Sequence, residues 1–171
     1  MLHDAFRASA RDGFRIVEYC VMQDHVHLLV EANDELALSR GMQGFLVRLA
    51  RGLNRAWKRR GSVLAERYHA RILKSPREVR HALRYVLLNG RKHGVRYAAD
   101  EADLFSSGPW FVGWCDVPAN GLTERSPVAD ARTWLLGVGW LRHGRLSLDD
   151  VPGRRVPRSL RSGASSSPGA T

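Results

Sequence analysis

The sequence predicts an α+β fold in which helices pack on a ferredoxin-like antiparallel sheet that lacks its first strand, followed by a small C-terminal accessory module. Hydrophobic periodicity gives the element order helix, strand, strand, helix, strand, helix, which is typical of helices layered on an antiparallel sheet. A ferredoxin-like βαββαβ unit needs one more strand before the first helix. The chain has 171 residues, 44% of them hydrophobic, which suffices for one such core with an appendage.

The first predicted elements are a short helix and a β-hairpin. Residues 3–11 are typical of a short helix or a helix end. Residues 14–22, FRIVEYCVM, and residues 25–32, HVHLLVEA, have the apolar and β-branched content of strands. Gln23–Asp24 supplies a tight turn between them, so the two strands are expected to form an antiparallel hairpin.

Two histidines one residue apart lie in the second strand of this hairpin. Side chains alternate faces along a strand, so His25 and His27 are expected to project together from one face. The apolar residues that face the core on the other side are Val26, Leu28 and Val30. Two imidazoles on one side of a stiff element can supply nitrogen ligands to a divalent metal, but the pattern alone also fits a half-buried strand with a polar face.

A long amphipathic helix is predicted over residues 35–60, with Gly61 just past its end. Its apolar face is formed by Leu38, Met42, Leu46, Leu49, Leu53 and Ala56. The alternating pattern that follows, VLAERYHARIL, predicts a third strand at residues 63–73.

The next helix has an explicit start. Ser75 is the expected N-cap, Pro76 takes the first helical position and Glu78 completes a capping box. The helix is predicted to continue to Asn89, with Gly90 as its stop.

The chain divides into three predicted parts. Residues 1–95 form the α+β domain, residues 96–151 form an accessory module, and residues 152–171 form a disordered basic tail because they are rich in Pro, Gly, Ser and Arg without periodicity. Tryptophans of the module could stack on unpaired bases, but a small accessory core is the favoured interpretation. These tryptophans are Trp110, Trp114, Trp134 and Trp140.

The composition indicates a polyanionic partner. The chain has 27 Lys+Arg against 17 Asp+Glu, a formal net charge of +10, which favours nucleic acid first and an anionic membrane surface second. No apolar run approaches the roughly 20 residues of a transmembrane helix, and the N-terminus does not resemble a signal peptide. Cys20 and Cys115 lack metal or redox spacing and are expected to be buried and reduced, as in a cytoplasmic protein.

Basic residues recur at helical spacing on the predicted helix 35–60. A surface that only confers solubility usually mixes charges, whereas this stripe contains no acid, so it is expected to contact DNA phosphates. The strand predicted at residues 63–73 adds further basic side chains on one face. The proposed phosphate contacts are Arg48, Arg51, Arg55, Arg59, Arg67, His69 and Arg71.

Tyr85 and Asn89 are spaced i, i+4 on the capped helix and are expected to share a face. Beside a histidine pair and a basic track, this spacing suggests a phenol nucleophile whose helix also presents an amide oxygen to a metal. Packing of Tyr85 as an ordinary surface aromatic is the alternative. Other tyrosines lie on predicted strands or lack such a partner: Tyr19, Tyr68 and Tyr97.

The sequence over residues 14–94 resembles the single-tyrosine HUH transposases, in particular their REP-associated branch. The resemblance depends on VMQDHVHLLVEA, on RYHARIL and on PREVRHALRYVLLNGRKHG. It differs from the family pattern at Gln23–Asp24 and Gly90, and in lacking the family's opening strand. The expectation is therefore either a true start upstream of Met1 or a decayed copy.

The resemblance implies a mechanism and its residues. Mg²⁺ or Mn²⁺ would be held by His25, His27 and Asn89, and Tyr85 would cleave single-stranded DNA beside a hairpin. Cleavage would give a 5′-phosphotyrosine intermediate, which a 3′-OH resolves during DNA transposition, a recombination reaction. A second copy of the chain, in a homodimer, is a further possible partner.

Three other functions are alternatives to this one. A histidine-triad hydrolase needs a third alternate histidine where this chain has Leu29. A two-histidine phosphodiesterase needs His-x-Ser/Thr motifs, which the sequence after His27 does not provide. A DNA- or RNA-binding domain that derives from a transposase and no longer cleaves remains compatible with the sequence.

Overall fold

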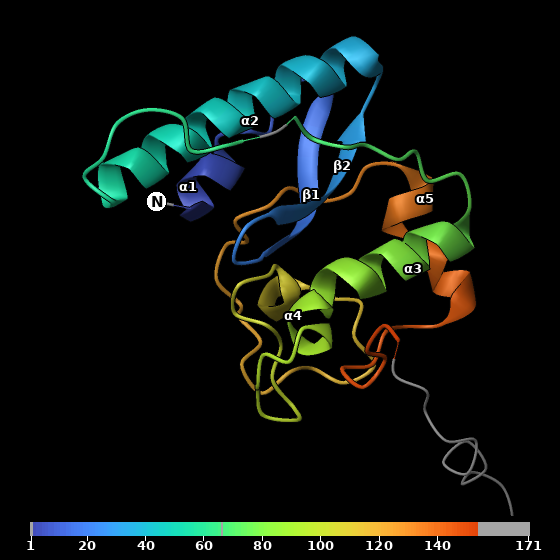
Figure 1. The fold of residues 1–171 in the computed structure, drawn as a ribbon. Coiled ribbons are helices and arrows are strands. Elements are labelled where there is room, and N and C mark those ends of the chain that lie inside the picture. The colour runs from blue at the N-terminus through green and yellow to red at the C-terminus, as the bar shows by residue number, and fades with distance from the viewer. Residues whose placement is uncertain (1, 66, 154–171) are drawn as a thin grey trace, which may run out of the picture.

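A two-stranded antiparallel sheet lies between two layers of helices in the computed structural model, which describes residues 2–65 and 67–153 (Figure 1). One layer contains α1 and α2, and the other contains α3, α4 and the C-terminal region (Figure 1). The bounds are α1 Leu2–Arg7, β1 Phe14–Val21, β2 Val26–Ala32, α2 Glu35–Ala56, α3 Pro76–Leu87, α4 Asn89–Lys92 and α5 Trp134–Gly137, with 3₁₀ turns η1 Gly108–Trp110 and η2 Gly139–His143. The mixed α+β class is therefore confirmed.

The hairpin has a β-bulge that directs its side chains to the two layers. β1 pairs antiparallel with β2, and the register shifts between Ile16 and Glu18. Ile16 and Tyr19 pack with α1 and α2, whereas Val17 and Cys20 pack with α3. The extra residue of the bulge lets both faces of one strand contribute to a core.

The facing predicted for β2 is confirmed for its apolar residues. Val26, Leu28 and Val30 pack against the cluster formed with α1 and α2. Leu29 packs on the opposite side with α3. Because side chains alternate, His27 lies on the same face as Leu29, toward α3.

The long helix α2 begins where predicted and ends earlier. Asp34 caps it, accepting a hydrogen bond from the Ala37 backbone N–H at 2.7 Å. The prediction extended the helix to residue 60, but the regular helix stops at Ala56 and Lys58 takes a left-handed conformation with φ of 50°. Six successive residues from 55 to 60 are exposed, so no buried face holds another turn in place.

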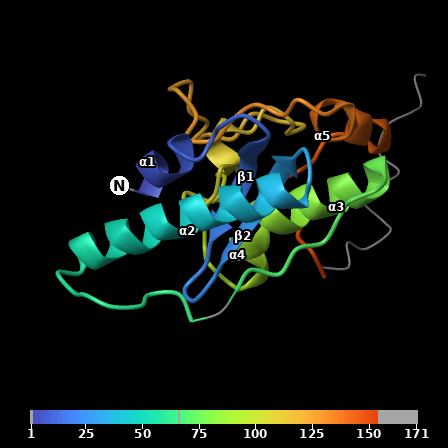
Figure 2. The same cartoon turned by 90° about the horizontal axis from the view of Figure 1, so that it is seen from above.

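The predicted third strand at residues 63–73 is wrong for the described residues. Residues 63–65 and 67–73 form no strand, and Figure 2 shows this connection passing the hairpin from α2 to α3. The outer edge of β1 is instead paired with another segment, because the Val21 N–H bonds the Phe105 carbonyl at 2.8 Å and the Ser107 N–H bonds the Tyr19 carbonyl at 3.0 Å. Alternating side chains form a strand only where a partner edge is available. A ferredoxin-like sheet is therefore not observed.

The start of α3 confirms the predicted cap, and its end differs from the prediction. Ser75 Oγ accepts from the Glu78 N–H at 3.3 Å, and the Glu78 carboxylate accepts from the Lys74 N–H at 2.7 Å. The helix ends at Leu87 rather than at Asn89. Leu88, at φ −112° and ψ 14°, interrupts it before α4 begins.

The C-terminal region contributes to the core that α3 forms with β1. Trp114 and Trp140 are buried there with Leu136 and Leu146, which confirms a packing role for those two tryptophans. Trp134 is 52% exposed and lies under the Arg142 guanidinium at 4.9 Å. The expected burial of the cysteines holds for Cys20, whereas Cys115 is exposed because it lies in the loop after Trp114.

Two expectations made from composition have different outcomes. Of the disordered tail predicted at residues 152–171, residues 154–171 lie outside the described part of the chain. Within the described part, no helix is both long enough and apolar enough to cross a membrane.

The buried carboxyl of Glu18 gives a pH-dependent stability prediction. Burial raises its pKa from 4.5 to about 8, and the Ser107 hydroxyl donates a hydrogen bond to it. Between these two values the unfolded chain has lost this proton and the folded chain keeps it, so the Glu18 contribution falls as pH rises, by up to about 1.4 kcal/mol per pH unit. We expect Glu18→Gln, which cannot ionise, to raise the free energy of unfolding more at pH 8 than at pH 5. Urea unfolding from pH 5 to pH 8 measures this free energy for both proteins. The same pH dependence in wild type and Glu18→Gln would contradict the prediction.

Candidate catalytic cluster

The two histidines of the hairpin lie with their ring nitrogens facing each other. His27 is on β2, and His25 precedes the strand in a turn closed by the Met22 N–H bonded to the His25 carbonyl at 2.8 Å. Their Nε2 atoms are 3.0 Å apart, and the rings are nearly perpendicular at 80°. Asp24 Oδ1 lies 2.6 Å from His25 Nδ1, which fixes that ring and leaves its Nε2 directed at His27.

The surroundings of His27 favour its neutral form. Partial burial is the largest cause that lowers its pKa, and the positive charges of His25, His93 and Lys92 lower it further. A neutral imidazole keeps a lone pair available for coordination. The proximity of Lys92 was not expected from the sequence.

Tyr85 on α3 is the tyrosine that lies beside this pair. Its ring centroid is 4.9 Å from that of His27 at an interplanar angle of 73°, and its side chain is 36% exposed. The Lys92 ammonium lies 4.8 Å from the same ring. Tyr85 therefore combines solvent access with contact to the histidines.

The other tyrosines have different surroundings. Tyr19 is buried, its hydroxyl is 3.2 Å from His3 Nε2, and burial raises its pKa. Tyr97 donates to Asp103 at 2.6 Å, and its pKa is raised by desolvation and by that hydrogen bond. Tyr68 is exposed and lies in the 63–73 connection.

Asn89 begins α4 and is fully buried, although Tyr85 is exposed. The break at Leu88 separates the two residues, so the regular i, i+4 face expected from the sequence is interrupted. The adjacent Gly90 N–H contacts the sulfur of Cys20, which is directly opposite His27 in the hairpin. Asn89 is thus on the histidine side of the sheet, and its Oδ1 and Nδ2 have no hydrogen-bond partner among the described residues.

A buried carboxylate holds the start of α4. Asp103 accepts from the Tyr97 hydroxyl at 2.6 Å and the Phe105 N–H at 2.8 Å, and its other oxygen is 3.6 Å from the Cys20 sulfur. Burial raises the pKa of Cys20 to about 12, so the thiol remains a hydrogen-bond donor. This network determines where Gly90, and with it Asn89, is placed.

Gly90 is required by this close approach. A Cβ at this position would lie 2.3 Å from Asp103 Oδ2. We expect Gly90→Ala to displace α4 and to lower the free energy of unfolding by about 1–3 kcal/mol, a typical cost of overpacking. Gly137→Ala is the control, since nothing lies within 4 Å of its added methyl group. Urea denaturation measures both variants, and equal midpoints for Gly90→Ala and Gly137→Ala would show that Gly90 is not required by the close approach of Asp103.

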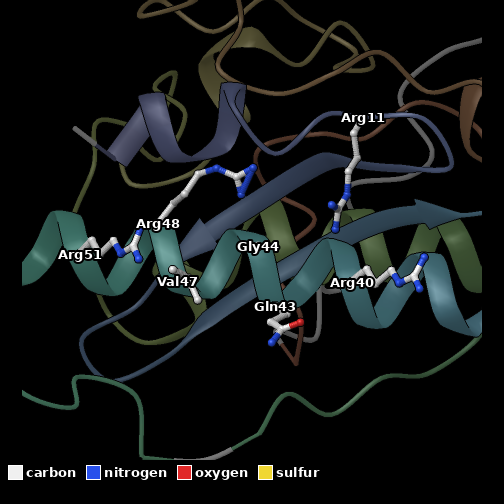
Figure 3. Close-up of a pocket in the computed structure, with 7 residues that line it drawn as sticks. All are labelled: Arg11, Arg40, Gln43, Gly44, Val47, Arg48 and Arg51. Atoms are coloured by element: carbon white, nitrogen blue, oxygen red, sulfur yellow. The ribbon is translucent and has the colours of Figure 1, made fainter.

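A basic pocket of about 430 Å³ lies on α2, in the other helical layer (Figure 3). Its lining residues are Arg11, Arg40, Gln43, Gly44, Val47, Arg48 and Arg51. A Cβ at Gly44 would lie 2.9 Å from Arg48 Nη1 and 3.7 Å from Arg11 Nη2, so both guanidinium groups approach the helix at this glycine. None of the lining residues is acidic, which makes the pocket suitable for an anion.

The predicted basic track is divided between two places. Arg48 and Arg51 line the pocket, with Arg55 one turn further along α2. Arg59 lies beyond the helix and donates to the Ser62 carbonyl at 2.9 Å. The rest of the track lies on the exposed 63–73 connection and consists of Arg67, His69 and Arg71, the last paired with Glu78 at 2.9 Å.

Comparison with known proteins identifies one family. The family described as transposase IS200 like matches residues 3–87, which include the histidine pair, Tyr85 and the α2 arginines. No curated protein and no solved structure matches the chain.

Proposed function

Residues 3–87 are an IS200-like transposase domain, and we propose that this domain cleaves and rejoins single-stranded DNA through a 5′-phosphotyrosine intermediate at Tyr85. Membership of this family implies a function in DNA transposition, nuclease activity and DNA binding. The observation that supports the mechanism best is the contact of an exposed tyrosine ring with a histidine whose Nε2 lies 3.0 Å from that of a second histidine. We also propose the REP-associated branch, from the motifs around His25 and Tyr85.

The proposed reaction conserves the phosphodiester energy. Tyr85 Oη loses its proton and attacks phosphorus, and the bond from phosphorus to the 3′ oxygen breaks. The leaving 3′ oxygen takes the electron pair and a proton, while the 5′ side stays attached to the tyrosine as a phosphodiester. A 3′-OH then attacks the same phosphorus and releases the tyrosine, so rejoining needs no nucleotide hydrolysis.

The histidine pair and Asn89 fit the divalent metal on which transposases of this type typically depend. The unpartnered buried amide of Asn89 supplies an oxygen ligand on the histidine side of the sheet, and His25 and His27 supply nitrogen ligands. We propose the Asn89 amide as the third ligand; in the described part of the chain, no group of three or more His, Cys, Asp or Glu residues is placed to hold a metal ion. When bound, Mg²⁺ or Mn²⁺ would polarise the scissile phosphate and neutralise its developing charge.

Arginines on α2 are proposed to hold the DNA backbone. Arg48 and Arg51 line an acid-free pocket, to which the structure adds Arg11 and Arg40. The lining includes no aromatic residue on which an unpaired base would stack, so this pocket is suited to phosphates rather than to bases. Arg55, Arg59, Arg67, His69 and Arg71 would extend the contact along the strand.

Salt-dependent binding tests this assignment. We expect Arg48→Ala and Arg51→Ala each to weaken binding of all DNA sequences similarly and to reduce the slope of log K against log salt by about one, because each removes one phosphate contact. Arg142→Ala, on η2, is the control and should leave the slope unchanged. Titration at several salt concentrations gives the result. A changed preference for one base with an unchanged slope would contradict the assignment.

The covalent product separates this function from the non-cleaving alternative. The full chain is incubated with Mg²⁺ or Mn²⁺ and single-stranded hairpin DNA labelled at its 3′ end, and the mixture is denatured. The label should migrate with the protein, and EDTA should prevent this. A folded, metal-supplied protein that binds this DNA without forming the product would instead be a nucleic-acid-binding domain.

A further inference from the structure

Lys92 is a positive charge beside the proposed nucleophile. It is the last residue of α4, and its ammonium nitrogen is 4.8 Å from the centroid of the Tyr85 ring. The edge-on neighbour of the same ring is His27, whose pKa is lowered in part by the charge of Lys92. The ammonium group therefore lies close to both the tyrosine and the histidine pair.

The side chain of Lys92 is available for a ligand. It is exposed, and no carboxylate pairs with it in the described residues. Its contact with the ring is a cation–π interaction, which at an exposed site contributes only about 0.5–1 kcal/mol. Loss of this contact alone is too small an effect to unfold the protein.

The fold, rather than the sequence spacing, brings Lys92 to this place. It lies seven positions after Tyr85 in the chain and beyond the matched residues 3–87. The break at Leu88 redirects the chain, and the Lys92 N–H then bonds the Leu88 carbonyl at 3.1 Å. Gly90, held against Asp103, fixes the short helix that carries Lys92.

We propose that Lys92 binds a nonbridging oxygen of the phosphate that Tyr85 attacks, an inference that depends on the proposed function. Tyr85 Oη is bonded to the ring beside the ammonium, so a phosphorus atom approached by Oη comes within reach of Lys92. The nonbridging oxygens carry the negative charge of the five-coordinate transition state, and a fixed ammonium stabilises that charge. Lys92 would thus complement the histidine pair and contact the phosphate directly.

Single-turnover adduct formation by the full chain tests this contact. With Mg²⁺ or Mn²⁺ and hairpin DNA, we expect Lys92→Ala to reduce the rate on the order of 100-fold, the usual effect of losing one charge-stabilising donor. Lys92→Met, which keeps an unbranched side chain but removes the charge, should be equally slow, and Lys92→Arg should recover part of the rate. DNA affinity measured in EDTA should change less than about threefold, as expected for one of many phosphate contacts. Lys74→Ala is the control lysine.

A neutral scissile phosphate identifies the atom that Lys92 contacts. A methylphosphonate replaces one charged nonbridging oxygen with a methyl group and gives two diastereomers. For the diastereomer that lacks the contacted oxygen, wild type and Lys92→Ala should react at equal rates. Two results would overturn the inference while leaving Tyr85 as the nucleophile. One is adduct formation by Lys92→Met at the wild-type rate, and the other is an equal rate defect of Lys92→Ala with unmodified DNA and with both diastereomers. A wild-type chain that forms no adduct with unmodified DNA would instead remove the proposed function, and this inference with it.

Discussion

Tyr85→Phe should abolish covalent attachment of DNA and leave DNA affinity unchanged. The substitution removes the attacking oxygen but keeps the ring that contacts His27 and Lys92. The side chain is 36% exposed, and no hydrogen bond to its hydroxyl is present in the described structure, so the fold should lose little stability. We expect adduct formation to fall at least 1,000-fold, on the order of losing a catalytic nucleophile. Denaturing electrophoresis of labelled DNA measures the adduct, and a filter-binding titration measures affinity.

Tyr68→Phe is the matched control for this variant. Tyr68 is 38% exposed, close to the value for Tyr85, but lies in the connection between α2 and α3. We expect this control to form the adduct at the wild-type rate. An adduct that persists in Tyr85→Phe and disappears in Tyr68→Phe would show that Tyr68, and not Tyr85, is the nucleophile.

His27→Ala should abolish metal-dependent cleavage with little loss of DNA affinity. The substitution removes one of two Nε2 atoms that lie 3.0 Å apart, and a single imidazole cannot hold the ion in the same place. The fall in the cleavage rate should be on the order of 1,000-fold, since the ion's stabilisation of the phosphate is lost. DNA affinity should persist because the arginines of α2 supply it. Cleavage time courses across a Mn²⁺ titration, with binding measured in EDTA, give both quantities.

His25→Ala should behave in the same way, and His143→Ala on η2 is the control. His143 is exposed and lies on η2, and it makes no contact with the histidine pair that the structure records. Cleavage by His27→Ala at the wild-type rate with an unchanged Mn²⁺ requirement would show that the metal is bound elsewhere.

Local signals in the sequence were sufficient for several elements. The cap at Ser75 and the start of α2 at Glu35 follow from side chains that bond nearby backbone N–H groups, so a few residues determine them. The alternation of Val26, Leu28 and Val30 likewise fixes which face of β2 is apolar. The same alternation predicts His27 on the opposite face, which is the face that packs with α3, whereas His25 lies in the turn before β2 rather than on the predicted strand.

Features that depend on distant parts of the chain were not predictable in this way. Residues 63–73 alternate like a strand, but the edge of β1 with which they could pair is occupied by residues 105–107. These residues follow β1 by about 85 positions in the chain. The break at Leu88 follows from packing of Gly90 against Asp103, which spacing does not reveal. Alternation and helical spacing could not identify Lys92 or Arg11. Lys92 lies on the short helix α4 after the break at Leu88, and Arg11 lies in the segment between α1 and β1.

The covalently modified residue tests the central claim most directly. Tryptic digestion of the DNA adduct, followed by nuclease trimming and mass spectrometry, identifies the peptide that carries the nucleotide. We expect the nucleotide on the peptide of residues 85–91, YVLLNGR, with the added mass on its single tyrosine, Tyr85. A nucleotide on residues 68–71, YHAR, or on any peptide without Tyr85, would contradict it.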